Sequence, residues 1–234
     1  MDHEFHARRG MSDWPLPDRA FHLADAENWA SIQREGLLST DALIARAGLE
    51  GSEAAPFRTY RNRGMRLPSG ALIRDQCPMP PSALVRCLDA ELSPDAWYGL
   101  VNSKVFFWLD VDRLNRHRAA CGARPQIIVA VDLPALLRRH GDRAFVTPFN
   151  VGNARRRAAK RGRRTFVPLS AWFDHRWESE AADGCAARAR SHKPAEIAME
   201  GSVPDLMDLI VEACPMAPHQ FCDGGEADAA PLSS

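Results

Sequence analysis

Residues Val105-Phe106-Phe107-Trp108-Leu109 form a continuous apolar run with the aromatic and β-branched bias of a buried strand. A second run, Gln126-Ile127-Ile128-Val129-Ala130-Val131, has the same character. We expect these two strands to form the middle of a sheet. After the second run, Asp132 is placed to cap a helix in which Pro134 occupies an early position that needs no amide hydrogen, and Gly141 ends that helix.

Shorter β-rich runs alternate irregularly with helical stretches on both sides of this pair. Irregular alternation favours an α+β domain over a doubly wound sheet. Further strands are predicted at 20–23, 145–147, 165–169 and 196–199, and further helices from Asp25 to Gly36 and over 205–211. Residues 50–81 hold glycines, prolines and five arginines with little apolar periodicity, so they are predicted to form a long loop that serves a site.

Length and composition indicate one domain. A chain of 234 residues with 45% hydrophobic content can bury one substantial core. Residues 19–222 are predicted to form this domain, and the polar segments 1–18 and 223–234 are expected to be disordered.

The charge and the apolar pattern give expectations about location and partners. Lys+Arg and Asp+Glu each number 30, so no net field steers the chain toward nucleic acid or membrane. There is neither a leader-like apolar core near the start nor a run of about 18 apolar residues, which predicts a cytoplasmic protein with no membrane partner. The six cysteines show no paired spacing, so free thiols and no metal site are expected.

Three segments carry a resemblance to a known family. They are the segment 21–38 (FHLADAENWASIQREGLL), the segment 102–109 (NSKVFFWL) and the segment 194–210 (PAEIAMEGSVPDLMDLI). Together they resemble the ADP-ribosyltransferase superfamily, and within it the DarT type that modifies DNA bases. The sequence is also similar to an uncharacterised bacterial group that shares the I-R-D-Q and V-F-F-W features.

The resemblance implies a fold and an activity. The fold would be an α+β domain with a mixed, strongly twisted sheet, an NAD cleft and flanking helices. The activity would be an NAD-dependent transfer of ADP-ribose to an acceptor, by analogy a base in single-stranded DNA or RNA, without a metal. A role as a toxin or phage-defence effector, with an antitoxin as a further partner, would follow from that activity.

The resemblance also assigns roles to individual residues. It places the catalytic carboxylate at Glu196 and an NAD contact at His22. The family's essential arginine falls between the first helix and the aromatic strand, and the chain offers five there, of which we predict that Arg74 is catalytic. The neighbours predicted to bind the cofactor are Arg58, Arg61, Arg63, Gln76 and, on the aromatic strand, Phe107.

Chemistry supports these residue types independently. Breaking the bond between ribose and nicotinamide builds positive charge on the sugar, which a carboxylate held against the ribose stabilises. The same carboxylate could accept a proton from the attacking nucleophile. A planar guanidinium matches phosphate oxygens in a forked geometry, which suits an arginine to the pyrophosphate.

A dense basic run is a candidate nucleic-acid contact, because phosphate contacts give affinity without sequence specificity. Within 155–164, seven of ten residues are basic: Arg155, Arg156, Arg157, Lys160, Arg161, Arg163 and Arg164. The other interpretation of this run is a solvated loop.

Two rival functions stay open at this point. One is RNA 2′-phosphotransfer on the same fold, although its Arg-His pattern is not recoverable in this chain. The other is a non-catalytic module that binds a nucleotide or a protein.

Overall fold

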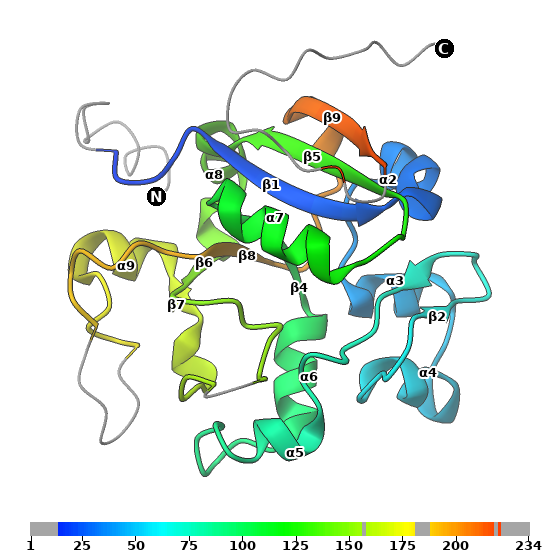
Figure 1. Ribbon diagram of the computed structural model, residues 1–234, viewed down its shortest axis with the longest axis horizontal. Coiled ribbons are helices and arrows are strands. Elements are labelled where there is room, and N and C mark those ends of the chain that lie inside the picture. The colour runs from blue at the N-terminus through cyan, green and yellow to red at the C-terminus, as the bar shows by residue number, and fades with distance from the viewer. Residues whose placement is uncertain (1–13, 156–157, 181–187, 218–219, 221–234) are drawn as a thin grey trace.

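A computed structural model describes residues 14–155, 158–180, 188–217 and 220, and its centre is a seven-stranded sheet (Figure 1). The strand order is β7-β6-β8-β4-β1-β5-β9. The strands are β1 (Arg19–Asp25), β4 (Lys104–Trp108), β5 (Gln126–Asp132), β6 (Ala144–Thr147), β7 (Val167–Pro168), β8 (Glu196–Glu200) and β9 (Ile210–Met216). All the pairings between these strands are antiparallel, so the predicted α+β class is confirmed and the predicted mixed sheet is wrong.

Helices cover both faces of this sheet. Successive strand residues face opposite ways, so Val129 packs into the main core with α8 and α9, while Ile128 packs under α7. The α-helices are α2 (Trp29–Glu35), α3 (Thr40–Arg46), α4 (Gly51–Arg58), α5 (Pro81–Leu84), α6 (Pro94–Asn102), α7 (Val111–Ala120), α8 (Leu133–His140) and α9 (Leu169–His175). Short 3-10 turns lie at Ala26–Asn28, Gly141–Arg143, Arg163–Thr165 and Leu206–Asp208.

The predicted centre of the sheet is confirmed. Strands β4 and β5 lie on either side of β1, and β5 pairs with β1 over seven residues. The predicted cap of α8 is also present, because the Asp132 carboxylate accepts a hydrogen bond of 2.7 Å from the amide of Ala135.

The sheet consists of two halves that meet at one position. Strands β1 and β4 pair only at Phe21 and Trp108, whereas β4 and β8 pair over five residues. Residues of both β1 and β4 line the cavity of the candidate site.

One segment predicted to be a loop and part of one predicted to be disordered belong to the folded domain. Residues 50–81 are not one long loop: they contain α4 and the hairpin of β2 (Met65–Arg66) with β3 (Leu72–Ile73), and they share a small core with Ile44 of α3. Residues 14–18 belong to the domain as well, because Leu16 is buried in the main core and the Asp18 carbonyl accepts a hydrogen bond from Leu133. The segments 1–13 and 221–234 lie outside the described residues.

Two predicted elements near the C-terminal half are wrong. The helix over 205–211 is replaced by a 3-10 turn and by β9, because β5 has an open edge whose amides and carbonyls β9 pairs. The strand over 165–169 is reduced to the two residues of β7, because a 3-10 turn and α9 take its ends.

Candidate functional site

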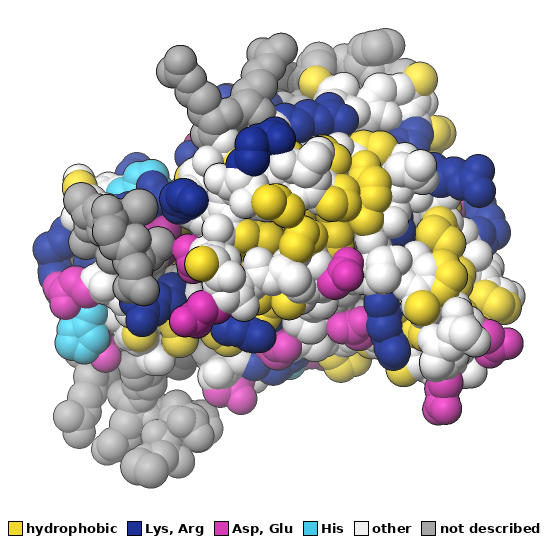
Figure 2. All heavy atoms as spheres, turned by 90° about the horizontal axis from the view of Figure 1, so that it is seen from below, with side chains coloured by type: hydrophobic (Ala, Val, Ile, Leu, Met, Phe, Trp, Pro, Cys, Tyr) yellow, Lys and Arg dark blue, Asp and Glu magenta, His cyan; other side chains and the backbone are white. Residues whose placement is uncertain are grey.

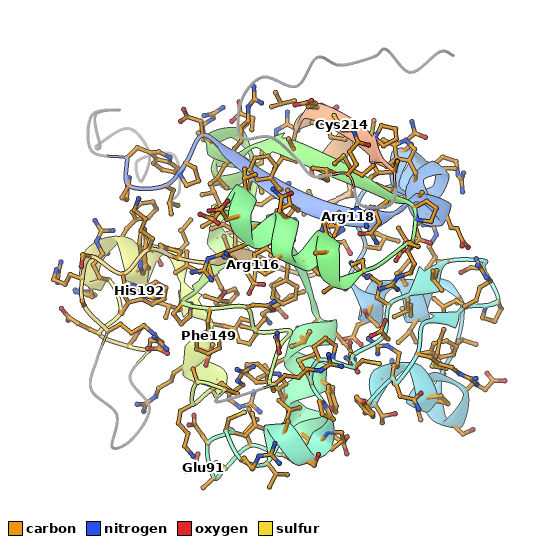
Figure 3. The ribbon with its side chains drawn as sticks, in the orientation of Figure 1. Glu91, Arg116, Arg118, Phe149, His192 and Cys214 are labelled. Carbon is orange, nitrogen blue, oxygen red and sulfur yellow. The ribbon has the colours of Figure 1, made fainter. Side chains whose placement is uncertain are left out.

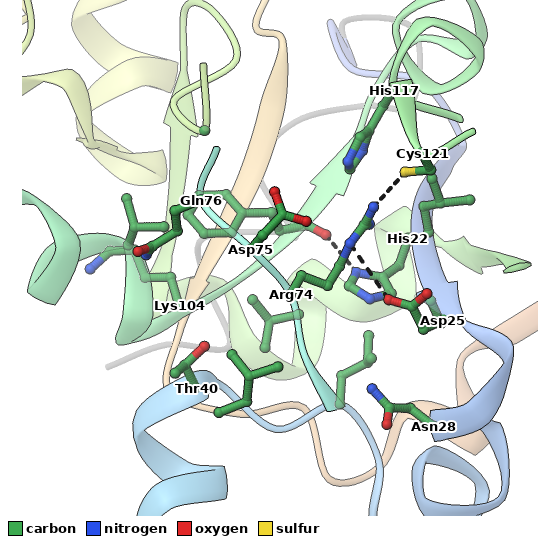
Figure 4. A pocket seen from close by; sticks show the side chains of 18 of the residues that line it. His22, Asp25, Asn28, Thr40, Arg74, Asp75, Gln76, Lys104, His117 and Cys121 are labelled. Atoms are coloured by element: carbon green, nitrogen blue, oxygen red, sulfur yellow. Dashed lines mark hydrogen bonds and ion pairs between the residues drawn. The ribbon is translucent and has the colours of Figure 1, made fainter. Parts of the chain in front are cut away.

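A cavity of about 590 Å³ collects five of the eight residues predicted for catalysis or cofactor binding (Figure 4). Its volume lies in the range of about 300–1,000 Å³ that is typical of ligand pockets. The predicted residues that line it are His22, Arg61, Arg74, Gln76 and Glu196. They come from β1, from the segment after α4, from the segment after β3 and from β8, so the fold brings together residues that are far apart in the sequence.

Glu196 is the buried carboxylate of this cavity. It begins β8, opposite Trp108 on one side and Thr147 on the other, and is 3% exposed. Oε2 accepts a 3.2 Å hydrogen bond from the amide of Val151 and lies 2.9 Å from the Thr147 hydroxyl. Burial raises the pKa of Glu196 to about 7, and these two contacts oppose the shift.

The hydroxyl of Thr147 explains how a neutral Glu196 is accommodated. Thr147 Oγ1 also lies 3.0 Å from the carbonyl of Phe149, and a hydroxyl has a single proton to donate. When that proton goes to the carbonyl, protonated Glu196 supplies the hydrogen of its own contact with Thr147. The site can therefore hold both protonation states of Glu196.

His22 has a defined tautomer. Its Nδ1 lies 2.9 Å from the carbonyl oxygen of Phe106, and because a carbonyl only accepts, Nδ1 carries the hydrogen and Nε2 is an acceptor. Burial, with a contribution from Arg74, lowers the pKa of His22 to about 4. Phe107 does not line the cavity: its ring is fully buried in the main core, and Phe106 lines the cavity in its place.

All three guanidinium nitrogens of Arg61 donate hydrogen bonds to other residues of the protein. Arg61 is 4% exposed, and its guanidinium donates to the Arg74 carbonyl at 3.1 Å, to the Phe57 carbonyl and to Asn102 Oδ1 at 3.1 Å. The Gln76 side chain accepts from the Arg61 amide at 3.1 Å and donates to Asn102. Burial lowers the pKa of Arg61 to about 10. Arg61 and Gln76 therefore build one wall of the cavity.

The Arg74 guanidinium has fewer protein partners than that of Arg61. Arg74 Nε lies 3.6 Å from Asp25 Oδ2, and Arg74 Nη2 contacts the Cys121 sulfur (Figure 4). Asp25 is 5% exposed, and its Oδ2 has no hydrogen bond among the described residues. Because these contacts are an ion pair and a thiol contact, the Arg74 side chain can exchange them for a ligand anion.

The other predicted cofactor arginines lie elsewhere. Arg58 and Arg63 are exposed and do not line the cavity, and Arg58 is 3.9 Å from Asp41. The guanidinium of Arg66 pairs with Glu27. Only Arg61 and Arg74 of the five arginines in this region line the cavity.

Helix α7 forms a wall that the sequence interpretation missed. The cavity is lined from this helix and the turn after it by side chains spaced three or four residues apart, which are Arg113, Arg116, His117, Ala120, Cys121 and Arg124. Arg118 points elsewhere: it is buried and donates to the Gly122 and Ala217 carbonyls (Figure 3). The available sequence signal was the pattern of Arg113, Arg116 and His117 on one helical face, followed by Arg124 just after the helix.

The basic run 155–164 is not a uniform surface patch. Arg161 is 2% exposed, donates to the Val151 carbonyl at 3.2 Å and lies over the Phe149 ring. Its predicted nucleic-acid contact is therefore corrected to a packing role against Phe149 and Val151, whose amide binds Glu196. The exposed members are Arg155, Lys160, Arg163 and Arg164, while Arg156 and Arg157 lie outside the described residues. Basic and acidic side chains are interspersed on the face that Figure 2 shows.

Metal-binding clusters and membrane-spanning helices are absent from the part of the chain that the structure describes. Within residues 14–155, 158–180, 188–217 and 220, no group of three or more His, Cys, Asp or Glu side chains is placed to hold a metal ion. No helix in that part of the chain is long and apolar enough to cross a membrane.

Comparison with known proteins identifies a family without a described function. No curated protein and no solved structure matches the chain. One family profile, described as "Family of unknown function (DUF7002)", matches residues 18–210, which is most of the chain. The chain therefore belongs to the DUF7002 family.

Proposed function

We propose that the protein transfers ADP-ribose from NAD to an acceptor, with Glu196 as the carboxylate that faces the reacting ribose. The observation that carries this proposal is the meeting of three distant segments. The segments that resemble ADP-ribosyltransferases include most of β1 and all of β4 and β8. These three strands are consecutive in the sheet, and each contributes to one cavity, with His22, Phe106 and Glu196 respectively.

The charges around the cavity suit a dinucleotide with a pyrophosphate. Six basic side chains line it, Arg61, Arg74, Lys104, Arg113, Arg116 and Arg124, against the three carboxylates of Asp25, Asp75 and Glu196. The chain as a whole has a formal net charge of zero, so this excess is local to the cavity. Guanidinium groups bind phosphate oxygens through paired hydrogen bonds, which supports an anionic ligand here.

The reaction needs a base and charge stabilisation at one place. The bond between the ribose C1′ and the nicotinamide nitrogen breaks, and its electron pair leaves with nicotinamide. A nucleophile of the acceptor forms the new bond to C1′ and gives up its proton. Ionised Glu196 stabilises the positive charge on the ribose and accepts that proton, so atoms and charge balance.

The acceptor we propose is a base in single-stranded DNA or RNA, as the resemblance implies. The exposed Arg155 lies two residues from Asn153, which lines the cavity, and its guanidinium donates to the Cys77 carbonyl at 3.2 Å. It therefore supplies a cation near the cavity for the backbone of such a strand. A toxin or phage-defence role follows from this activity, and an antitoxin would then be a partner.

The test is transfer of label from NAD. Purified protein is incubated with NAD labelled in the ADP-ribose moiety and with single-stranded DNA, single-stranded RNA or cell protein, while nicotinamide release is measured in parallel. The native chain is compared with Glu196→Gln and with the control Glu212→Gln, which alters a partly exposed carboxylate on the edge strand β9. We expect Glu196→Gln to lower transfer by about 10²–10³-fold, and Glu212→Gln to act as the native chain.

Two outcomes would contradict the proposal. NAD binding without release of nicotinamide from any mixture would favour the non-catalytic module. Transfer that Glu196→Gln leaves intact would remove Glu196 from the chemistry. As a further check, the transfer rate of the native chain should rise with pH through about 7, where Glu196 ionises.

A further inference from the structure

His117 is a cavity residue that the proposed reaction does not use. It lies on the cavity face of α7, one residue from Arg116 and four from Cys121, whose sulfur contacts Arg74 (Figure 4). The groups whose charges act on it are Arg74, His22, Arg124 and Asp75. His117 is therefore near the cationic part of the cavity.

The structure fixes which nitrogen of His117 carries the hydrogen. The indole Nε1 of Trp108 lies 3.1 Å from His117 Nδ1, and the two rings meet edge to face with centroids 5.6 Å apart. An indole N–H only donates, so Nδ1 must be the acceptor and the hydrogen of the neutral ring is on Nε2. Within the part of the chain that the structure describes, no residue pairs with Nε2.

The two imidazoles of the cavity thus have opposite characters. His22 donates from Nδ1 to the Phe106 carbonyl and presents an acceptor at Nε2, whereas His117 presents a donor at Nε2. Burial and the neighbouring Arg74 lower the pKa of His117 to about 3, so the ring stays neutral at ordinary pH. A neutral donor beside guanidinium groups adds a hydrogen bond without adding charge repulsion.

We propose that His117 binds the pyrophosphate of the dinucleotide, by donating from Nε2 to a phosphate oxygen that Arg74 also contacts. This inference rests on the proposed function and deepens it. Trp108 acts as the positioning residue, because its indole holds the ring in the tautomer that donates. The proposal places one binding group on α7 and the other on the segment after β3, on two walls of one cavity.

The first experiment reads the tautomer directly. Nitrogen-15 NMR of the native chain at pH 7 should show His117 neutral with its proton on Nε2, and saturating ADP-ribose should shift the Nε2 resonance. A proton on Nδ1, or a resonance that ADP-ribose leaves unchanged, would overturn the inference. This measurement needs no variant and does not depend on turnover.

The second experiment compares ligands with and without the pyrophosphate. Affinities for ADP-ribose, NAD and adenosine are measured for the native chain, His117→Leu and His117→Gln. The control is His140→Leu, which alters a histidine on α8 that pairs with Asp205 at 2.7 Å and does not line the cavity. We expect His117→Leu to weaken ADP-ribose and NAD about tenfold and adenosine hardly at all, whereas His117→Gln, which keeps an N–H donor, stays within about threefold of native.

The outcomes separate this inference from the proposed function. If His117→Leu binds ADP-ribose as the native chain does, or loses ADP-ribose and adenosine equally, the inference is wrong and the proposed transfer is untouched. If the native chain binds neither NAD nor ADP-ribose, both are wrong.

Discussion

The regions around Arg61 and Glu196 hold buried charges on one cavity in opposite ways. Around Arg61 the charge is shared among the Phe57 and Arg74 carbonyls and Asn102, so each nitrogen of the guanidinium has a partner. Among the described residues, the Glu196 carboxylate accepts hydrogen bonds from one amide and one hydroxyl, and its pKa is raised to about 7. The Arg61 region is a hydrogen-bond network in which every guanidinium nitrogen has a partner, whereas Glu196 is an ionisable group whose pKa lies near neutral pH.

The two hydrogen-bond environments distinguish a residue that stabilises the fold from a residue that can take part in a reaction. A buried charge whose partners are complete contributes to the fold, because removing it leaves those partners unsatisfied. A buried group with a perturbed pKa and a cavity in front of it is a candidate for function. Arg74 is partly buried with few partners and Arg116 is exposed, and four predictions compare the side chains of Arg61, Glu196, Arg74 and Arg116.

Arg61→Ala should have the largest effect on stability. It leaves the Phe57 and Arg74 carbonyls without this donor in a buried place, while Asn102 Oδ1 keeps its 3.3 Å bond from Gln76, and each carbonyl left unpaired costs about 1–3 kcal/mol. We expect the free energy of unfolding in urea to fall by about 4 kcal/mol, and Arg61→Lys to recover only part of it. Unfolding that matches the native chain, combined with lost ligand binding, would reverse the assignment of Arg61 as support.

Glu196→Gln should act in the opposite direction. The folded pKa of Glu196 is about 7 against 4.5 for an unperturbed group, so ionisation costs stability as pH rises from about 4.5 to about 7, and the deficit remains above that. At pH 8 the Gln variant should be more stable than the native chain by up to about 3 kcal/mol, and at pH 4.5 the difference should vanish. Urea titrations at both pH values measure this, and a difference that does not depend on pH would contradict the raised pKa.

Arg74→Gln should affect ligand binding more than the fold. Its partners are Asp25 and the Cys121 sulfur, so we expect a loss of about 1 kcal/mol in the free energy of unfolding and a weakening of ADP-ribose binding by about 10–100-fold. The matched control is Arg66→Gln, an exposed arginine that pairs with Glu27 and does not line the cavity. Calorimetric titration of both variants decides the point, and equal affinities would exclude Arg74 as a phosphate ligand.

Strand patterns in the sequence were sufficient for the part of the site that lies on the sheet. The apolar runs around Phe106 and Val129 predict β4 and β5, and the Ala-Glu-apolar pattern predicts β8 with Glu196 at its first position. Periodicity identifies such elements because each buries a continuous apolar surface. Periodicity could not show which face of β4 lines the cavity. The sequence prediction names Phe107, whereas Phe106 lines the cavity.

The polar parts of the site could not be predicted in the same way. The segment 50–81 has little apolar periodicity, so its folding around a small core was missed, and the choice among its arginines depends on carbonyls and amides from other segments. Arg161 is buried by aromatic rings, which a count of basic residues does not show. The α7 wall was missed because its arginines are typical of a solvated helical face.

Of the four substitutions, Arg116→Gln should have the smallest effect on stability and on ligand binding. Arg116 is exposed at the cavity rim, and no described residue pairs with its guanidinium, so the free energy of unfolding should change by less than about 0.5 kcal/mol. A cation at the rim attracts an anionic ligand through solvent, and salt screens this attraction. Arg116→Gln should therefore weaken ADP-ribose binding about threefold at low salt and hardly at all in 0.5 M salt, where the native chain has also lost the attraction. An Arg74→Gln effect that persists in 0.5 M salt beside an Arg116→Gln effect that disappears would distinguish a cation that contacts the ligand from one that only attracts it. If both effects disappear in salt, Arg74 belongs with Arg116 as a long-range cation and the proposed contact with the pyrophosphate is wrong.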